Sequence, residues 1–287
     1  MQTVNRLPEL RAAVDRLRAA GEVALVPTMG ALHEGHLTLV REARKHAPAV
    51  VVSIFVNPTQ FGPNEDLGAY PRQLREDTRM LEAEGVDLLW APSVEEVYPD
   101  GFVTTVSVAG LSETLCGASR PGHFDGVATV VAKLFGQVRP DIALFGEKDW
   151  QQLAVIRRMA SDLDLTQPFA ERILGVPTVR EPDGLAMSSR NRYLSPEDRQ
   201  RAAWLPRLMH NAVDEISVGM DVDSALRWLE TELIDAGFTS VDYAELADAE
   251  SLQPQMALTD SPARLFVAAR IGGTRLIDNM PVAAARA

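Results

Sequence analysis

Residues 1–179 alternate between short apolar runs and longer amphipathic stretches, and this alternation most constrains the fold. The apolar runs cover Val23 to Val26, Val50 to Val56, Val86 to Trp90 and Ile142 to Phe145. They are continuous rather than alternating, which is typical of strands that are buried on both faces of a parallel sheet. The intervening stretches have helical periodicity, and we expect helices over 35–46, 71–84, 126–137 and 149–161. The chain is therefore predicted to form an α/β, Rossmann-like, doubly wound parallel sheet.

Two other parts of the chain carry different patterns. Phe102 to Val108 alternates between apolar and polar residues, which predicts an edge or antiparallel strand. Beyond residue 179, helices are expected over 196–218 and 222–236, and short strands over 243–246, 265–269 and 274–277. We therefore expect two domains, residues 1–179 and a smaller α+β domain over residues 180–287.

Composition excludes several classes of protein. The formal net charge of −12 over 287 residues argues against broad binding to nucleic acids or anionic membranes. The apolar runs are far shorter than the ~20 residues that span a bilayer, and no signal-type stretch opens the chain. A single cysteine, Cys116, forms no internal disulfide and no zinc cluster. These properties fit a cytoplasmic enzyme whose partners are small molecules, with neither nucleic acid nor membrane among them.

Polar segments follow three of the expected strands, over residues 27–36, 57–61 and 146–149. Ligands of open parallel sheets bind beyond the carboxyl ends of the strands. We therefore expect the three segments to lie at one edge of the sheet and to form a site.

The first segment contains two glycines and two histidines. Gly30 allows a close turn after the strand, and Gly35 allows a ligand to approach the helix start. Backbone N–H groups and the helix dipole favour an anion there, and His33 and His36 project to one side of the helix. Two imidazole N–H groups can then hold a phosphate. The alternatives are surface histidines at an ordinary helix start or a metal-binding pair, which is less favoured because no third ligand is evident.

The other polar segments are ambiguous one by one. Lys148 is suited to ATP phosphates, whereas Asp149 is equally well explained as the N-cap of the next helix. The hydroxyls and guanidinium of residues 188–190 suit phosphate oxygens or, alternatively, form a polar hinge that caps a helix. The amides of Gln60 and Gln152 suit a small polar acid, although surface glutamine is common.

Together these segments closely resemble the pantothenate synthetase (pantoate–β-alanine ligase) family. The matching blocks occur in family order over nearly the whole chain: PTMGALHEGH (27–36), VVSIFVNPTQF (51–61), GASRPGHFDGV (117–127), PDIALFGEKDWQQL (140–153), GVPTVREPDGLAMSSRNRYL (175–194) and RLIDN (275–279). The resemblance implies a cytidylyltransferase-like nucleotide-binding fold. Two stretches depart from the family pattern: Thr59 replaces the common methionine before the glutamine, and residues 165–173 fit poorly.

The resemblance also implies the chemistry. ATP and (R)-pantoate form an enzyme-bound pantoyl-adenylate with release of pyrophosphate, and the amine of β-alanine then displaces AMP to give pantothenate. Mg²⁺ is used, and family members are generally cytoplasmic homodimers. His36 is the implied catalytic histidine, usually assigned as a proton donor; our hypothesis is that it acts mainly as a hydrogen-bond donor. The second domain is expected to close over the site as a lid.

The resemblance assigns binding residues position by position. The implied ATP contacts are Met29, Gly30, Ala31, Leu32, His33, Glu34, Gly35, His36, Gly146, Glu147, Lys148, Asp149, Val179, Met187, Ser188, Ser189 and Arg190. The implied pantoate contacts are Gln60 and Gln152, with Gln60 also reaching β-alanine, and Asn57, Tyr70 and Arg120 correspond to further pocket positions. No protein residue is assigned as a metal ligand.

Three other functions compete with a ligase. A nucleotidyltransferase of the same fold joins a nucleotide to a phosphate, and its product keeps the nucleotide, whereas a ligase releases AMP. A nucleotide-sensing module binds ATP without releasing pyrophosphate, and it needs neither paired histidines nor a second polar pocket. A tRNA synthetase is disfavoured by the acidic charge and by the lack of an anticodon-binding extension.

Overall fold

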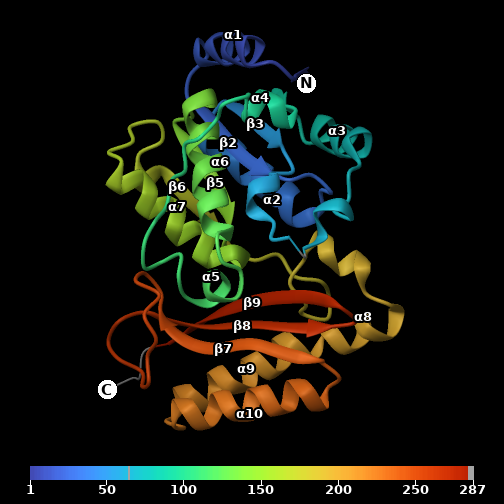
Figure 1. Ribbon diagram of the computed structural model, residues 1–287, viewed down its shortest axis with the longest axis vertical. Coiled ribbons are helices and arrows are strands. Elements are labelled where there is room, and N and C mark those ends of the chain that lie inside the picture. Colours follow the sequence, from blue (N-terminus) through green and yellow to red (C-terminus); the bar gives the residue numbers. More distant parts are fainter. Residues whose placement is uncertain (64, 284–287) are drawn as a thin grey trace. The chain divides into compact units, whose positions relative to one another are not determined.

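The computed structural model describes residues 1–63 and 65–283. Two compact units make up the chain (Figure 1). The first unit comprises residues 1–112, 120–147 and 152–177, and the second comprises residues 113–119, 148–151 and 178–287. The short segments 113–119 and 148–151 thus group with the C-terminal residues. The domain bounds expected from the sequence, 1–179 and 180–287, stay a prediction.

A six-stranded parallel sheet forms the centre of the first unit, with the strand order β1-β4-β3-β2-β5-β6. Its strands are β1 (Gln2–Val4), β2 (Val23–Thr28), β3 (Ala49–Ile54), β4 (Leu88–Trp90), β5 (Ile142–Gly146) and β6 (Ile173–Val176). The predicted parallel sheet is confirmed. Strands β1 and β6 were not expected, because Gln2 and Thr3 of β1 are polar and Gly175 interrupts the apolar run of β6.

Helices cover both faces of this sheet. They are α1 (Leu7–Arg18), α2 (Glu34–His46), α3 (Leu74–Ala83), α4 (Val94–Val97), α6 (His123–Val138) and α7 (Trp150–Asp162). On one face, Val26 of β2 and Val40 of α2 belong to one buried cluster. On the other face, Trp90 Nε1 donates to Gln137 Oε1 of α6 at 3.1 Å. The doubly wound, Rossmann-like arrangement is therefore confirmed.

The register of the sheet brings the strand ends to one edge. Thr28, the last residue of β2, pairs with Ile54, the last residue of β3. Leu25 of β2 pairs with Ala143 of β5, so β5 ends at about the same level. Beyond the strands, Phe55 N donates to Thr28 O at 3.0 Å. The expected convergence of polar segments at this edge follows from the register.

Two predicted elements differ from the structure. No strand occurs over residues 102–108 in the described chain, so the predicted edge strand is wrong. Val103 there is 90% exposed, and Val106 N donates to the Thr129 hydroxyl at 2.9 Å rather than to a neighbouring strand. The helix expected from Pro71 starts at Leu74 instead. The alternation of apolar and polar residues therefore belongs to an extended segment, which has no partner strand within the described part of this chain.

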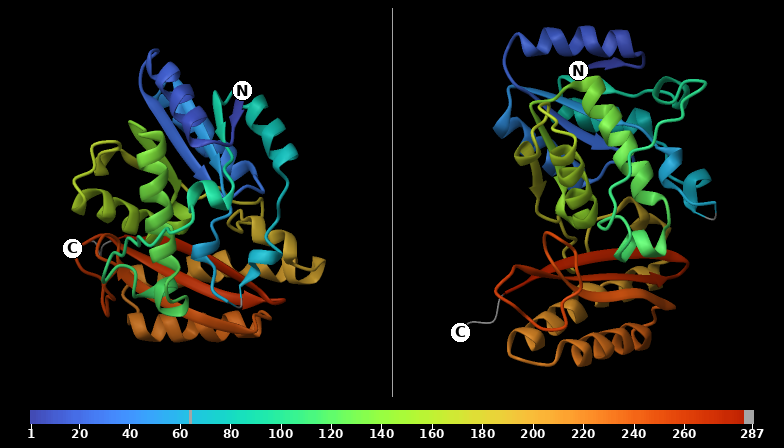
Figure 2. Two further views of the ribbon diagram at one scale, coloured as in Figure 1. Left: turned by 45° about the horizontal axis from the view of Figure 1, so that its top comes forward. Right: turned by 60° about the vertical axis from the view of Figure 1, so that its left-hand side comes forward.

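The second unit pairs an antiparallel sheet with helices. Its sheet has the order β7 (Ser240–Asp248), β8 (Ala263–Ile271) and β9 (Thr274–Val282), and its helices are α5 (Leu115–Ser119), α8 (Pro196–Ala202), α9 (Trp204–Ser217) and α10 (Val222–Asp235). Figure 2 shows α9 in amber and α10 in orange against one face of the sheet, in which β7 is orange and β8 and β9 are red. The predicted smaller α+β part is confirmed. The single helix expected over 196–218 is two helices, since Pro206 has no N–H to donate to the preceding turn.

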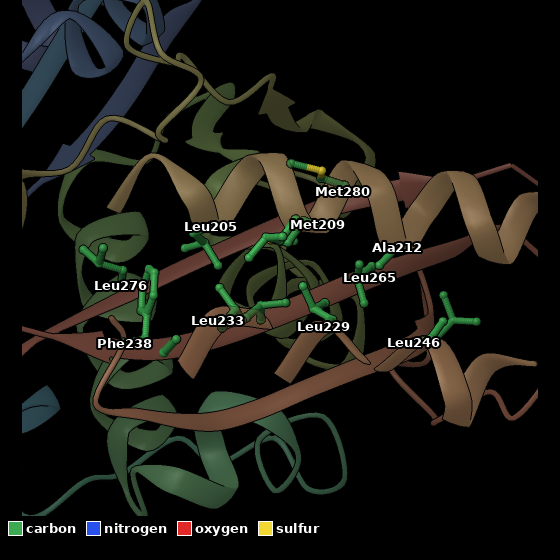
Figure 3. Packing of buried hydrophobic residues seen from close by; sticks show 14 of the residues in the cluster. Leu205, Met209, Ala212, Leu229, Leu233, Phe238, Leu246, Leu265, Leu276 and Met280 are labelled. Atoms are coloured by element: carbon green, nitrogen blue, oxygen red, sulfur yellow. The ribbon is translucent and has the colours of Figure 1, made fainter. Parts of the chain in front are cut away.

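One hydrophobic core holds the second unit together. Leu205 and Met209 of α9, Leu229 and Leu233 of α10, and Leu265 of β8 pack in a single buried cluster (Figure 3). Every second residue of β8 and β9 faces these helices, which leaves the intervening side chains on the opposite face of the sheet. In the part of the chain that the structure describes, no helix is both long and apolar enough to cross a bilayer.

Candidate functional site

The turn between β2 and α2 is anchored by a buried carboxylate. Asp77 of α3 is 1% exposed, and its oxygens accept the backbone N–H groups of Ala31 and Leu32, each at 2.9 Å. Ala31 has the left-handed φ of 51° and Gly30 a φ of 83°. A side chain at Gly30 would also lie 3.1 Å from Asp77 Oδ2. The turn therefore needs a glycine at position 30 and an acceptor at position 77.

Asp77 was missed by the analysis of the sequence alone. The available signal was its position in the helical pattern, because Asp77 lies one turn before Leu81 on the buried face of α3. A carboxylate on the apolar face of a helix needs hydrogen-bond donors, and these come from the turn.

His33 and His36 form a capping box at the start of α2. His33 Nδ1 accepts from Gly35 N at 3.2 Å, and His36 Nδ1 accepts from His33 N at 3.3 Å. The ring centroids lie 4.1 Å apart. Because each Nδ1 accepts a backbone hydrogen, the neutral form of each ring bears its hydrogen on Nε2. Both histidines thus have a structural role, and that role fixes the nitrogen that donates.

The segment after β3 lies beside this turn. Gln60 ends the short turn η1 (Pro58–Gln60), and its Nε2 donates to the Met29 sulfur at 3.0 Å. Asn57, 1% exposed, donates to Gln60 Oε1 at 3.1 Å and to Gly126 O at 3.0 Å. Asn57 Oδ1 accepts from the Tyr98 hydroxyl at 2.8 Å. The polar segments 27–36 and 57–61 therefore meet, and the Asn57 amide holds the Gln60 side chain through a hydrogen bond.

Close packing against α6 fixes the backbone of η1. A Cβ atom at Gly126 would lie 2.5 Å from Thr59 O and 2.7 Å from Gln60 N, so only glycine fits there. The Thr59 hydroxyl donates to Asn57 Oδ1 at 2.9 Å. The threonine that departs from the family pattern is thus tied into the hydrogen bonds of this turn.

Arg120 also contacts η1, but its charge is neutralised. Its guanidinium forms a two-pronged ion pair with Glu65, with 2.7 Å from Nε to Oε1, and Nη2 donates to Gln60 O at 3.3 Å. Burial works to raise the pKa of Glu65, but the Arg120 guanidinium outweighs it and holds that pKa below its usual value. His123 Nδ1 lies 2.8 Å from Gln60 O. Tyr70 is buried and packs edge-on against Phe61 at 5.8 Å.

Gly146 is the last residue of β5, and Glu147 follows it at the same sheet edge. A side chain at Gly175 of β6 would lie 3.0 Å from Glu147 Cγ, so β6 passes closely beside Glu147. Gln152 is half-buried in the first turns of α7. Within the first unit, the structure thus brings Met29, Asn57 and Arg120 into contact with Gln60.

The predicted residues of the second unit begin with Lys148 and Asp149. They lie in a short 3-10 turn before α7, with 3.7 Å between Lys148 Nζ and Asp149 Oδ1. Lys148 O accepts from Asn279 Nδ2 of β9 at 2.9 Å. The neighbouring Gln151 is buried and donates to Thr114 O at 2.8 Å, which gives this amide a structural role.

Val179 and Met187 face each other across a tight hairpin. Met187 N donates to Val179 O at 3.0 Å, and Arg180 forms a two-pronged ion pair with Asp278, at 2.6 and 2.9 Å. Ser188 caps the 3-10 helix η5 (Ser189–Tyr193) by accepting from Arg190 N at 3.3 Å. The capping alternative for Ser188 is therefore observed.

Metal-binding side chains do not cluster in the described ranges. Over residues 1–63 and 65–283, no group of three or more His, Cys, Asp or Glu side chains is arranged to hold a metal ion. The donor atoms of the first unit are instead imidazole, amide and backbone N–H groups, which suit anionic and hydroxylated ligands.

Comparisons with known proteins cover almost the whole chain. The family model described as pantoate-beta-alanine ligase matches residues 2–281. The pantothenate synthetase of Novosphingobium aromaticivorans is 65% identical over 98% of this chain and 99% of its own length. That of Sphingopyxis alaskensis is 59% identical over 98% and 100%.

Solved structures agree. Pantothenate synthetase from Thermus thermophilus aligns with a TM-score of 0.91 and 51% identity, over 98% of this chain and 99% of that one. A Francisella tularensis pantoate-beta-alanine ligase, described as complexed with beta-gamma ATP and beta-alanine, aligns with a TM-score of 0.82 and 34% identity, over 98% and 97%. The strand-end segments that meet at Gln60 are thus those of a known family, and the chain belongs to the pantoate-beta-alanine ligases.

Proposed function

We propose that this chain condenses (R)-pantoate with β-alanine through a pantoyl-adenylate, and that MgATP is the activating substrate. The observation that carries the proposal is the contact between Met29 and Gln60, because it places the capped start of α2 beside an amide at the sheet edge. Family membership supports the same chemistry.

In the first step, ATP lies against residues 29–36. The positive end of α2 and the Nε2–H groups of His33 and His36 face the phosphates. A pantoate carboxylate oxygen attacks the α-phosphorus, the bond to the bridging oxygen of pyrophosphate breaks, and negative charge shifts onto the departing oxygens. Preorganised donors stabilise that charge, each contributing on the order of 3 kcal/mol.

His36 acts in this step mainly as a neutral hydrogen-bond donor. Its Nδ1 accepts from His33 N, so the backbone orients the ring and leaves Nε2 as the nitrogen that carries the hydrogen. A neutral donor of fixed orientation stabilises charge without having to transfer its proton.

Pantoate is held by neutral groups. Gln60 and Gln152 bind its hydroxyl and carboxylate oxygens, and Gln60 also reaches β-alanine. Asn57 and Arg120 act by positioning Gln60, since both hydrogen-bond to it and the Arg120 charge is already matched by Glu65. Tyr70 contributes to the wall of this pocket through Phe61.

In the second step, the amine of β-alanine attacks the acyl carbon and the acyl–phosphate bond breaks, which releases AMP. The adenylate is already activated, so the protein contributes chiefly proximity and exclusion of water. We assign further ATP contacts to Gly146, Glu147, Lys148, Asp149, Val179 and 187–190, and a lid function to the C-terminal domain (residues 180–287).

The magnesium ion enters with ATP rather than through a cage of protein ligands. Mg²⁺ usually keeps several waters and binds through substrate phosphates with one or two carboxylates. We also propose that the chain is a cytoplasmic homodimer. The extended segment 102–108 supports a partner, because its β-branched residues, such as Val103, are exposed.

Pyrophosphate release tests the proposal. Protein mixed with MgATP and pantoate should release pyrophosphate but little AMP, and adding β-alanine should then release AMP and form pantothenate. A nucleotidyltransferase would keep the nucleotide in its product, and a sensing module would release no pyrophosphate. Either result would contradict the assignment.

A further inference from the structure

Asn279 of β9 links the sheet of the second unit to the backbone of Lys148. It is 3% exposed, and its Nδ2 donates to Lys148 O at 2.9 Å. Its Oδ1 accepts from Arg264 Nε of β8 at 2.8 Å. Exchanging the amide oxygen and nitrogen would lose both bonds, because a donor faces Oδ1 and an acceptor faces Nδ2. The amide therefore has a single orientation.

Arg264 is held in turn by an aromatic ring. Its guanidinium carbon lies 3.7 Å from the centre of the Trp150 ring, and it is 9% exposed. Trp150 Nε1 donates to Ala249 O at 2.7 Å, which fixes the ring. Arg264 and Asn279 lie on the face of the sheet opposite α9 and α10, so this face carries the segment that contains Lys148 and Trp150.

The preceding residue, Asp278, has a similar role on the other face of the sheet. Its carboxylate has no exposed surface and binds the guanidinium of Arg180 at both oxygens. Arg180 also donates to Gly184 O at 3.0 Å, across the hairpin that joins Val179 to Met187. Two consecutive residues of β9 therefore hold two separate loops in which the family resemblance places ATP contacts.

We propose that Asn279 is a positioning residue for Lys148 in the adenylation step. This inference rests on the proposed role of Lys148 as an ATP contact. A lysine side chain is flexible, so the position of its charge depends on where its backbone is held. The Asn279 amide fixes that backbone at the carbonyl, and Arg264 with Trp150 fixes the amide.

The variant Asn279→Asp tests the inference with little change in shape. It keeps an oxygen for Arg264 but replaces the donor to Lys148 O by a second oxygen, which repels the carbonyl. We expect the rate of pyrophosphate release to fall at least tenfold or the KM for ATP to rise at least tenfold. The conversion of added pantoyl-adenylate and β-alanine to pantothenate should stay within about twofold, because the charge that Lys148 offsets in the adenylation step develops on pyrophosphate, which takes no part in this half-reaction. Asn211→Asp, on the exposed side of α9, adds the same charge and serves as the control.

A double-mutant cycle separates positioning from a general structural effect. If Asn279 acts through Lys148, the variant carrying both Lys148→Ala and Asn279→Asp should be no slower than Lys148→Ala alone. If the losses of the two single variants multiply in the double variant, the inference is wrong. It is also wrong if Asn279→Asp slows both half-reactions equally. If Asn279→Asp does not fold, Arg264→Lys is used in the same cycle, since it keeps the charge and loses the Nε bond and the planar stacking. Wild-type protein that released no pyrophosphate would instead contradict the proposed function itself.

Discussion

The carboxylate of Asp77 accepts the backbone N–H of Leu32 at 2.9 Å, although 45 residues separate the two in the sequence. Its second oxygen accepts from Ala31 N at the same distance. Asp77 therefore links α3 to the turn that precedes both histidines of the capping box. The conformation of this turn is decided by a residue that lies outside it.

Removing this acceptor should impair both stability and activity. In Asp77→Asn, one of the two backbone N–H groups faces an amide NH₂ instead of an oxygen. An unsatisfied buried donor costs about 1–3 kcal/mol, and we expect a loss of that size in urea unfolding. Pyrophosphate release should fall about tenfold or more, because a displaced turn misplaces His33 and His36. A variant with wild-type adenylation would show that the turn keeps its shape without Asp77.

His36→Ala should slow adenylation by roughly a hundredfold or more, since it removes a preorganised donor. The variant also removes the Nδ1 acceptor for His33 N, so a modest drop in melting temperature is expected alongside. His46→Ala, at the exposed end of the same helix, is the matched control and should leave adenylation unchanged. Single-turnover pyrophosphate release measures the effect, and an unchanged rate in His36→Ala would remove this histidine from the mechanism.

Alanine substitutions at two glycines of α6, Gly126 and Gly136, test how the pantoate site is positioned. Gly126→Ala would bring a methyl group to within 2.5 Å of Thr59 O, so η1 and Gln60 must move. Nothing lies within 4 Å of the same position at Gly136. We expect Gly126→Ala to raise KM for pantoate at least tenfold, whereas Gly136→Ala should keep KM and gain up to about 1 kcal/mol of stability from helix propensity. Equal KM values in the two variants would show that η1 does not position the pantoate amide.

The fold and the meeting of the first two polar segments could be predicted from the sequence because their signals are local. Continuous apolar runs predicted the parallel strands, and His33 and His36 predicted a helix start with two imidazole rings on one side. The supporting residues could not be predicted in the same way. Asp77 and Asn279 act on residues that are distant in sequence, and a lone carboxylate or amide in a periodic pattern does not reveal its partner. The alternation at Phe102 to Val108 misled for a related reason, because a strand also needs a neighbouring strand to pair with.

Glu245 of β7 gives the second unit a pH dependence whose sign can be worked out. Burial raises the pKa of Glu245 above its usual value, and among the described residues its Oε1 has no hydrogen-bond partner. A carboxyl group whose pKa is higher in the folded state than in the unfolded state contributes to the free energy of unfolding. This contribution is complete at pH values below the unfolded pKa, and it is lost as the pH rises through the folded pKa. At pH 7 the ionised group is therefore less favourable than a neutral amide. We expect Glu245→Gln to raise the free energy of unfolding by about 1 kcal/mol at pH 7, the low end of the cost of an unsatisfied buried group. The difference should vanish near pH 4, where both side chains are neutral.

Glu230→Gln on the exposed surface of α10 is the control and should show no such pH-dependent gain. Urea unfolding of the three proteins at both pH values decides the matter, because a gain of equal size at pH 4 would mean that the amide acts through packing rather than through loss of charge.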